Sequence, residues 1–255
     1  MLPDPTTYTP DVPRARIGFI IPSSNRMVEP QMHRYVPAGV VPHVTRIRMT
    51  NQHKAPLDQL LPRIVAAAEL LADSKCDVTV LQCTGTSMSG GVDMETQVVA
   101  AIEQATGRPA LTTASALNDA FAALGARRLV FTSETKEDEH RPKLAYLREA
   151  GYDILADRAA CLSGTDAYCV TPARFWYDLA VSMRNEAADA YFLSCANIQA
   201  TDVIEELERT LGKPVVTSNQ AALWCSLRKA GIADLVPGLG TLMRHGLPVR
   251  KPAAA

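Results

Sequence analysis

Two cysteines of this chain stand where a parallel sheet would place reactive groups. Cys83 and Cys195 each end an apolar, strand-like run, and each leads into small and polar residues. The residues that follow are Thr84 and Gly85 in the first case and Ala196 and Asn197 in the second. Ligands of open parallel sheets bind beyond the carboxyl ends of the strands. Two thiols there would act as acid, base or nucleophile on opposite faces of a carbon held between them.

Any single cysteine has a simpler interpretation, because free cysteine is often a small buried hydrophobe. The other cysteines, which keep that interpretation, are Cys76, Cys161, Cys169 and Cys225. Cys83 and Cys195 differ because they occupy matching positions of an internal repeat. We also expect helix N-termini after their strands to lower the two thiol pKa values. No CxxC pair occurs, so the sequence lacks the spacing of a zinc ribbon or a thioredoxin-like site.

The repeat is visible in the order of the apolar blocks along the chain. Ile17 and Leu129 open corresponding runs 112 positions apart, and the same 112 positions separate Cys83 from Cys195. We therefore predict two similar halves, at residues 1–115 and 116–235, followed by a C-terminal tail at 236–255. The sequence leaves open whether the last helix of the second half packs back on the first.

Strand-length apolar runs alternate with longer segments of helical period, a pattern typical of α/β proteins with parallel sheets. The runs at 16–22 and 76–83 indicate buried strands, and the segment at 57–74 has the apolar spacing of a helix packed on a sheet. Further helices are expected near 93–104, 115–124, 139–150, 172–185, 201–211 and 219–230. We therefore predict an α/β fold in which each half is a parallel sheet flanked by helices. A pseudo-two-fold axis would relate the halves, with the site in the cleft between them.

Composition and missing motifs argue against several classes of binding partner. The chain has 255 residues, of which 47% are hydrophobic, and its net charge of −1 argues against a partner as strongly charged as nucleic acid. Its Pro-rich, polar opening lacks the features of a signal peptide, and no apolar run is long enough to span a membrane. We expect a soluble cytoplasmic protein. The five histidines have no metal-ligand spacing, and no phosphate-binding glycine loop occurs.

Three segments carry a resemblance to a known family: 18–30 (GFIIPSSNRMVEP), 82–87 (QCTGTS) and 193–224, which begins LSCANIQ. With the two-half layout, they resemble the aspartate/glutamate racemase superfamily. Within it, the most similar branch holds maleate cis-trans isomerases, arylmalonate decarboxylases and related ectoine-utilisation proteins. The resemblance runs from about Arg16 to Leu235, and it implies no metal or organic cofactor.

The resemblance also implies roles for single residues. Asn25 falls where the isomerases bind a substrate carboxylate, and Cys83 falls where they keep the attacking cysteine. Thr84 matches a residue that helps to bind the carboxylate, and Cys195 matches the partner acid or base. We add as binding candidates the neighbouring small and polar residues Ser24, Gly85, Ala196 and Asn197. Ser24 is also an ordinary helix-capping residue.

Two features of the match leave alternatives open. Arylmalonate decarboxylases carry glycine at the first cysteine position, and an alignment on the string Gly85 to Ser87 would place Gly85 there instead of Cys83. We prefer Cys83 because it preserves the repeat of 112 positions. The family also commonly has a tyrosine after the third strand, where this chain has Glu134.

An ionised glutamate only accepts hydrogen bonds, so Glu134 would repel a substrate carboxylate where a tyrosine would bind it. It would instead face an ammonium, amide or hydroxyl group of the substrate, or Ser133 or Thr135 would supply the missing donor. Alternatively, Glu134 points into solvent as part of the charged run ETKEDEHR.

These observations predict a cofactor-independent isomerase or racemase that acts next to the carboxylate of a small (di)carboxylic acid through Cys83 and Cys195. One alternative is a decarboxylase of substituted malonates, in which Cys195 alone protonates the enediolate. Another is a carboxylate-binding accessory protein without turnover. We expect the binding partner to be a small carboxylate, and neither nucleic acid nor a membrane. The sequence leaves open whether the chain forms a homo-oligomer.

Overall fold

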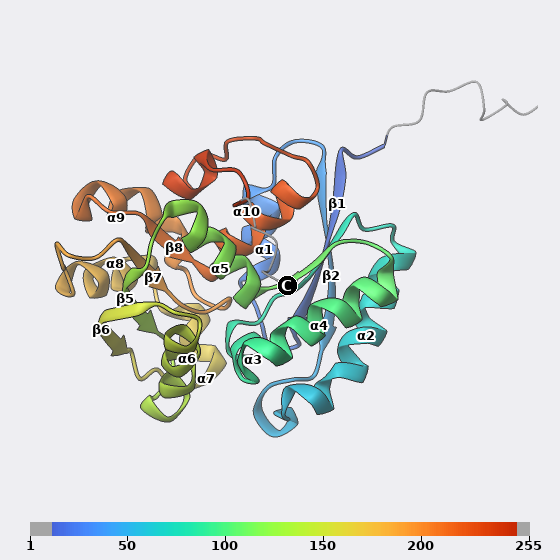
Figure 1. Ribbon diagram of the computed structural model, residues 1–255, viewed down its shortest axis with the longest axis horizontal. Coiled ribbons are helices and arrows are strands. Elements are labelled where there is room, and N and C mark those ends of the chain that lie inside the picture. The colour runs from blue at the N-terminus through green and yellow to red at the C-terminus, as the bar shows by residue number, and fades with distance from the viewer. Residues whose placement is uncertain (1–11, 249–255) are drawn as a thin grey trace, which may run out of the picture.

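The computed structural model describes residues 12–248. They form two four-stranded parallel sheets, with the strand orders β2-β1-β3-β4 and β6-β5-β7-β8. The first sheet consists of β1 (Ala15–Pro22), β2 (Val40–Ile47), β3 (Val78–Leu81) and β4 (Ala110–Thr112). The second consists of β5 (Arg128–Ser133), β6 (Asp153–Ala159), β7 (Ala190–Leu193) and β8 (Val215–Thr217). Figure 1 shows the first sheet on the right of the molecule and the second on the left.

The two sheets have the same register as well as the same order. Ile17 pairs with Val78 in the first sheet, and Leu129 pairs with Ala190 in the second. Both members of the second pair lie 112 positions after their counterparts in the first, as the sequence repeat predicts. The predicted α/β fold of two similar parallel sheets flanked by helices is confirmed. The division of the chain at residue 115 stays a prediction.

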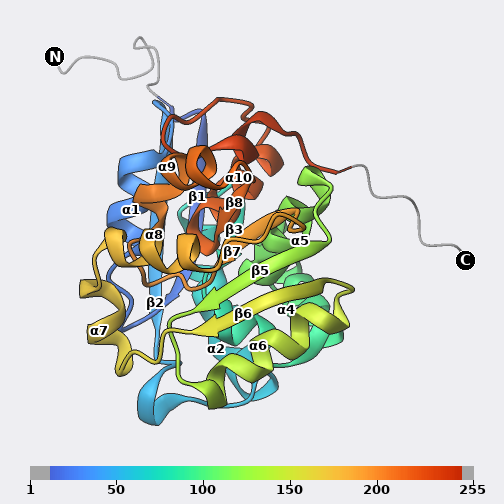
Figure 2. The same ribbon diagram turned by 90° about the vertical axis from the view of Figure 1, so that its left-hand side faces the viewer.

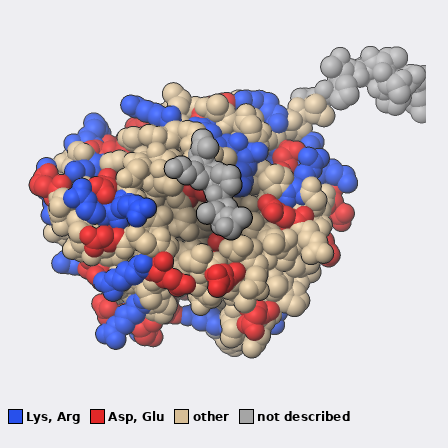
Figure 3. All heavy atoms as spheres, viewed as in Figure 1, with Lys and Arg blue, Asp and Glu red and all other residues tan. Residues whose placement is uncertain are grey.

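Helices cover both sheets. Those of the first part of the chain are α1 (Val28–Tyr35), α2 (Leu57–Asp73), α3 (Thr84–Met88), α4 (Gly91–Thr106) and α5 (Thr113–Leu124). Those of the second part are α6 (Glu137–Glu149), α7 (Gly164–Val170), α8 (Ala173–Ser182), α9 (Ile204–Leu211) and α10 (Ser218–Lys229). None of the helices in residues 12–248 is long and apolar enough to cross a membrane. Figure 3 shows acidic and basic side chains interspersed over one face of the molecule.

Helix α10 lies near the centre of the molecule with α5 (Figure 1). Each of the two helices begins with a capping box, in which Thr112 and Ser115 or Thr217 and Gln220 bond to each other's backbone N–H groups. Although α10 follows the second sheet in sequence, it packs against α1, α5, β3 and β4 of the first part. Its residues from Ser218 to Leu227 are all buried.

Residues 236–248, the described part of the segment that we assigned to a C-terminal tail, pack against the rest of the molecule at several points. Leu239, Leu242 and Met243 are buried, and the last two lie in a short 3-10 helix, Thr241–Arg244. Trp224 of α10 donates its Nε1 hydrogen to the backbone oxygen of His245 at 2.9 Å. Residues 249–255 lie outside the described part. Figure 2 shows the segment running past α10.

Candidate active site

A cleft of about 840 Å³ opens where the carboxyl ends of the central strands of both sheets meet. Its lining includes all nine residues that the sequence proposed for the site: Ser24, Asn25, Cys83, Thr84, Gly85, Glu134, Cys195, Ala196 and Asn197. The structure therefore brings these residues together from four separate loops. The roles that we assigned to them stay predictions.

Cys83 lies on the wall formed by the first half, between β3 and the short helix α3. Its Sγ donates to Thr86 Oγ1 at 3.1 Å, and the Thr86 hydroxyl donates to Met49 Sδ at 3.6 Å. Burial raises the pKa of the Cys83 thiol, although Thr86 and the nearby Lys143 ammonium act in the opposite direction. Our expectation of a lowered thiol pKa is wrong for this residue, because the loss of water outweighs the favourable contacts.

Cys195 lies on the opposite wall, two residues after the end of β7, and is only 9% exposed. Its Sγ accepts a hydrogen bond from the backbone N–H of Asn197 at 3.2 Å. Burial and then the Glu134 carboxylate raise its pKa well above the ordinary value of a thiol, so the expected lowering is wrong here too. The φ angle of Cys195 is +116°, in a region that residues with a side chain rarely adopt. The active-site loop therefore holds a strained backbone at the thiol.

One hydroxyl group joins the two walls. Ser218 Oγ, at the start of α10, accepts hydrogen bonds from Thr84 Oγ1 at 2.8 Å and from the backbone N–H of Cys195 at 3.1 Å. The Thr84 hydroxyl proton is therefore engaged within the protein. The predicted contact of Thr84 with a carboxylate would have to come from its backbone N–H or from a rearranged hydroxyl.

Asn25 is buried and connects the first half to the loop after Cys195. Its Nδ2 donates to the backbone oxygen of Ala196 at 3.0 Å, and its Oδ1 accepts from the N–H groups of Met27 and Val28 at the start of α1. An amide nitrogen carries two hydrogens, so one remains for a ligand. Asn197 Oδ1 in turn accepts from the backbone N–H of Arg26 at 2.8 Å.

A buried amide network beneath the cleft was not predicted. Gln82 Nε2 donates to Asn219 Oδ1 at 2.8 Å, and Asn219 Nδ2 donates to Gln31 Oε1 at 2.7 Å and to the Ala196 oxygen at 3.1 Å. These residues come from both halves, so the network fixes one wall against the other. Gln82 carried a signal, since it interrupts an apolar run directly before Cys83.

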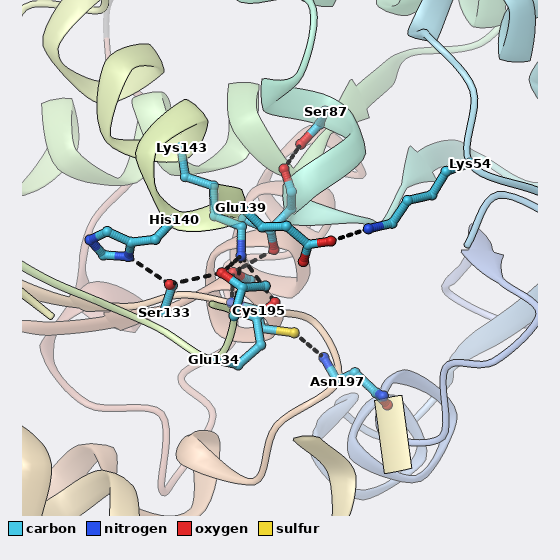
Figure 4. Close-up of polar contacts among 12 residues, drawn as sticks. Lys54, Ser87, Ser133, Glu134, Glu139, His140, Lys143, Cys195 and Asn197 are labelled. Carbon is cyan, nitrogen blue, oxygen red and sulfur yellow. Dashed lines mark hydrogen bonds and ion pairs between the residues drawn. The ribbon is translucent and has the colours of Figure 1, made fainter. Parts of the chain in front are cut away.

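Glu134 does not point into solvent, which settles one of the alternatives left open by the sequence. It lies after β5 and forms an ion pair with Lys143 of α6, whose Nζ contacts its two oxygens at 3.0 and 2.9 Å. The side chains are 7% and 5% exposed. Burial alone would lower the pKa of Lys143, but the Glu134 carboxylate raises it through its charge and its hydrogen bonds, so the ammonium stays charged. Figure 4 shows the pair beside Cys195.

Contacts outside the cleft fix the end of β5, the strand that precedes Glu134. Ser133 Oγ bonds to His140 Nδ1 at 2.7 Å, and His140 Nε2 bonds to Asp157 Oδ1 at 3.0 Å. The His140 ring also stacks on Phe131, with 4.9 Å between the ring centroids. His140 is buried and does not line the cleft, so its contacts position β5 against α6.

At the mouth of the cleft, Lys54 of the first half forms an ion pair with Glu139 of α6 (Figure 4). Both residues line the cleft. Among residues 12–248, no group of three or more His, Cys, Asp or Glu side chains is placed to hold a metal ion.

The known proteins to which this chain is similar include maleate isomerases and arylmalonate decarboxylases. A family model described as arylmalonate decarboxylase matches residues 17–243. A maleate isomerase of Pseudomonas putida is 27% identical over 241 residues, which cover 89% of this chain and 96% of that protein. An arylmalonate decarboxylase of Bordetella bronchiseptica is 28% identical over 230 residues, which cover 89% and 95%.

Solved structures agree with these sequence matches. A maleate cis-trans isomerase of Nocardia farcinica, 26% identical, superposes with a TM-score of 0.83 over 90% of this chain and 98% of its own. That structure is of a variant in which a serine replaces one cysteine, and it contains a covalently bound succinylcysteine intermediate.

Proposed function

Since this chain belongs to the arylmalonate decarboxylase family, we propose that it is a cofactor-independent isomerase or racemase of a small carboxylic acid, similar to the maleate cis-trans isomerases. The observation that carries the proposal is the placement of one cysteine on each wall of a single cleft. The comparisons support it, because the relatives include maleate isomerases and one of them forms a covalent bond to cysteine.

In the isomerase reaction, the Cys83 thiolate adds to the alkene carbon next to a carboxylate. A sulfur–carbon bond forms, and the π electrons move towards the other carboxyl carbon to give an enediolate. The Cys195 thiol then donates its proton to the neighbouring carbon, which leaves a saturated thioether. After rotation about the single bond, Cys195 takes the proton back and the Cys83 sulfur leaves, so that the trans alkene forms with no net change in protons.

In the racemase reaction, the same two groups act on a carbon that already bears hydrogen. One thiolate removes the proton next to the carboxylate, and the thiol on the other wall delivers a proton to the opposite face. Both reactions pass through an enediolate, whose negative charge must be stabilised by fixed hydrogen-bond donors. The free Nδ2 hydrogen of Asn25 and the backbone N–H groups of Thr84 and Gly85, in the first turn of α3, would supply them.

The decarboxylase alternative is favoured by the family model and by the Bordetella relative. Cys83 is the feature against it. A second thiol facing a planar enediolate would protonate it on the wrong face, and stereochemical control would be lost.

The test is to incubate the purified protein in D₂O with maleate, aspartate-like acids and phenylmalonate. Isomerisation, or deuterium incorporation without CO₂ release, supports the proposal, whereas CO₂ release supports the decarboxylase. Cys83→Ala and Cys195→Ala should each lower turnover at least about 100-fold, as expected for loss of a nucleophile or an acid–base group. Cys161→Ser, at an exposed cysteine outside the cleft lining, is the matched control. Full turnover by both alanine variants would refute the mechanism.

Ligand-dependent thermal stabilisation with no product from any acid would favour the accessory-protein alternative. The cytoplasmic location and the formation of a homo-oligomer stay predictions, the latter to be measured by light scattering.

A further inference from the structure

The Glu134–Lys143 ion pair lies inside the cleft between the two cysteine walls. Its electrostatic influence reaches both Cys83 and Cys195. The Lys143 stem passes over Gly85, whose added Cβ would lie 3.8 Å from Lys143 Cε. A ligand that contacts both thiols would therefore meet this pair with one of its ends.

The pair offers a donor and an acceptor side by side. Two hydrogens of the Lys143 ammonium point to the Glu134 oxygens, and the third has only Thr135 Oγ1 nearby, at 3.5 Å. That distance is too long for a good hydrogen bond, so the third hydrogen is available to a ligand. The Glu134 carboxylate has about four acceptor positions, of which Lys143 occupies two and the Cys195 thiol reaches a third, so one remains for a ligand.

The charge of the cleft does not suit a second carboxylate at this place. The charged residues of the lining balance one another: Lys54, Lys136 and Lys143 against Glu134, Asp138 and Glu139. A carboxylate next to Glu134 would put two anions on one buried ammonium, and like charges at such a contact are strongly unfavourable. An ammonium group would instead be repelled by Lys143, which is 3.0 Å or less from each Glu134 oxygen.

We propose that the substrate carries one carboxylate and, at its other end, a primary carboxamide that binds the Glu134–Lys143 pair. The amide N–H donates to Glu134, and the amide oxygen accepts the third hydrogen of Lys143. The inference rests on the proposed function, since it names the substrate class of the same site. It also explains a glutamate where the family commonly has a tyrosine, because a neutral amide both donates and accepts.

The first experiment measures binding without turnover. Succinate and its half-amide, succinamate, have no double bond and differ only in the group under test. We expect succinamate to bind at least about tenfold more tightly by calorimetry, a difference of the size that one unfavourable charge contact produces. Equal or tighter binding of succinate overturns the inference, and so does the absence of measurable binding of either ligand at millimolar concentration.

A paired variant ties the preference to these two side chains. Glu134→Gln with Lys143→Met removes both charges and leaves neither of them buried alone, and the preference for succinamate should fall to within about twofold. The matched control is Arg174→Met with Asp178→Asn, which removes an exposed ion pair of α8 and should leave the preference unchanged. An unchanged preference in the first variant would contradict the assignment.

Turnover then separates the two proposals. The wild-type protein should isomerise maleamate with a higher kcat/KM than maleate, and both activities should depend on Cys83. A preference for maleate with intact cysteine dependence would refute only the amide assignment. Turnover that does not need the cysteines would refute the proposed function, whatever the succinamate ratio.

Discussion

The strained backbone at Cys195 leads to a prediction about stability that does not depend on any substrate. Cys195→Ala keeps the Cβ that makes a φ of +116° unfavourable, whereas Cys195→Gly removes it. Both variants lose the hydrogen bond from the Asn197 N–H to Sγ, so that loss cancels when the two are compared. The difference in their free energies of unfolding therefore reports the backbone strain at this position.

The expected difference follows from two opposing effects. A residue with a side chain in a sparsely populated φ/ψ region costs about 1–3 kcal/mol. Glycine costs about 0.5–1 kcal/mol relative to alanine through its greater freedom in the unfolded chain. The glycine variant should then be more stable than the alanine variant by about 1 kcal/mol, which for a chain of this size raises Tm by about 2–4 °C.

Urea denaturation and thermal unfolding of the two variants would measure this difference. Cys225 provides a matched control, since it lies within α10, where the backbone is helical. There, Cys225→Gly should be less stable than Cys225→Ala by about 1 kcal/mol, the opposite sign. The reasoning is refuted if Cys195→Gly is no more stable than Cys195→Ala while the control behaves as expected.

Three further predictions concern the pH response and the contacts that hold the cleft. Because burial raises the pKa of both active-site thiols above the ordinary 9.0, the unfolded chain loses these protons first. Above about pH 9, the free energy of unfolding should therefore fall, while turnover rises as thiolate forms. Replacing both thiols by alanine should make this fall smaller in urea denaturation but not abolish it, because burial also raises the pKa of Cys76 to about 11. Ser218→Ala leaves the Thr84 hydroxyl and the Cys195 N–H without an acceptor, so the free energy of unfolding in urea denaturation should fall by about 1–3 kcal/mol. A fall of less than about 0.5 kcal/mol would contradict this role of Ser218. Lys143→Met alone leaves the Glu134 charge buried without a partner, so the free energy of unfolding should fall by about 3–5 kcal/mol. Adding Glu134→Gln should restore most of that loss in a double-mutant cycle, whereas additive losses would contradict the coupling of the two side chains.

Sequence patterns predicted the central strands and missed the edges. β1 and β3 are buried on both faces and appear as continuous apolar runs, but β2 and β6 are edge strands with a mixture of exposed and partly buried residues. β2 also contains Pro42, which is tolerated at an edge because no second neighbour needs its missing N–H. β2 and β6 therefore lack the pattern from which a strand is predicted, whereas the edge strands on the other side, β4 and β8, are fully buried but only three residues long.

The sequence predicted the site residues that follow the ends of strands. It missed those that reach the cleft from other elements. Lys143 comes from the buried face of α6, where it follows His140 by three positions and precedes Leu147 by four. That spacing placed a lysine on an apolar face, which was a usable signal. The direction of the thiol pKa shifts was wrong because sequence indicates helix starts but not how completely the surrounding chain removes water.

The position of α10 has a consequence for how the protein is made. Its residues from Ser218 to Leu227 are all buried, and they cover β3 and β4, strands that leave the ribosome more than 100 residues earlier. Until α10 follows, the first sheet exposes an apolar surface that has no partner, which is the state in which nascent chains aggregate. Synthesis stalled before residue 218 should therefore yield a chain that needs a chaperone, however well its first sheet is formed.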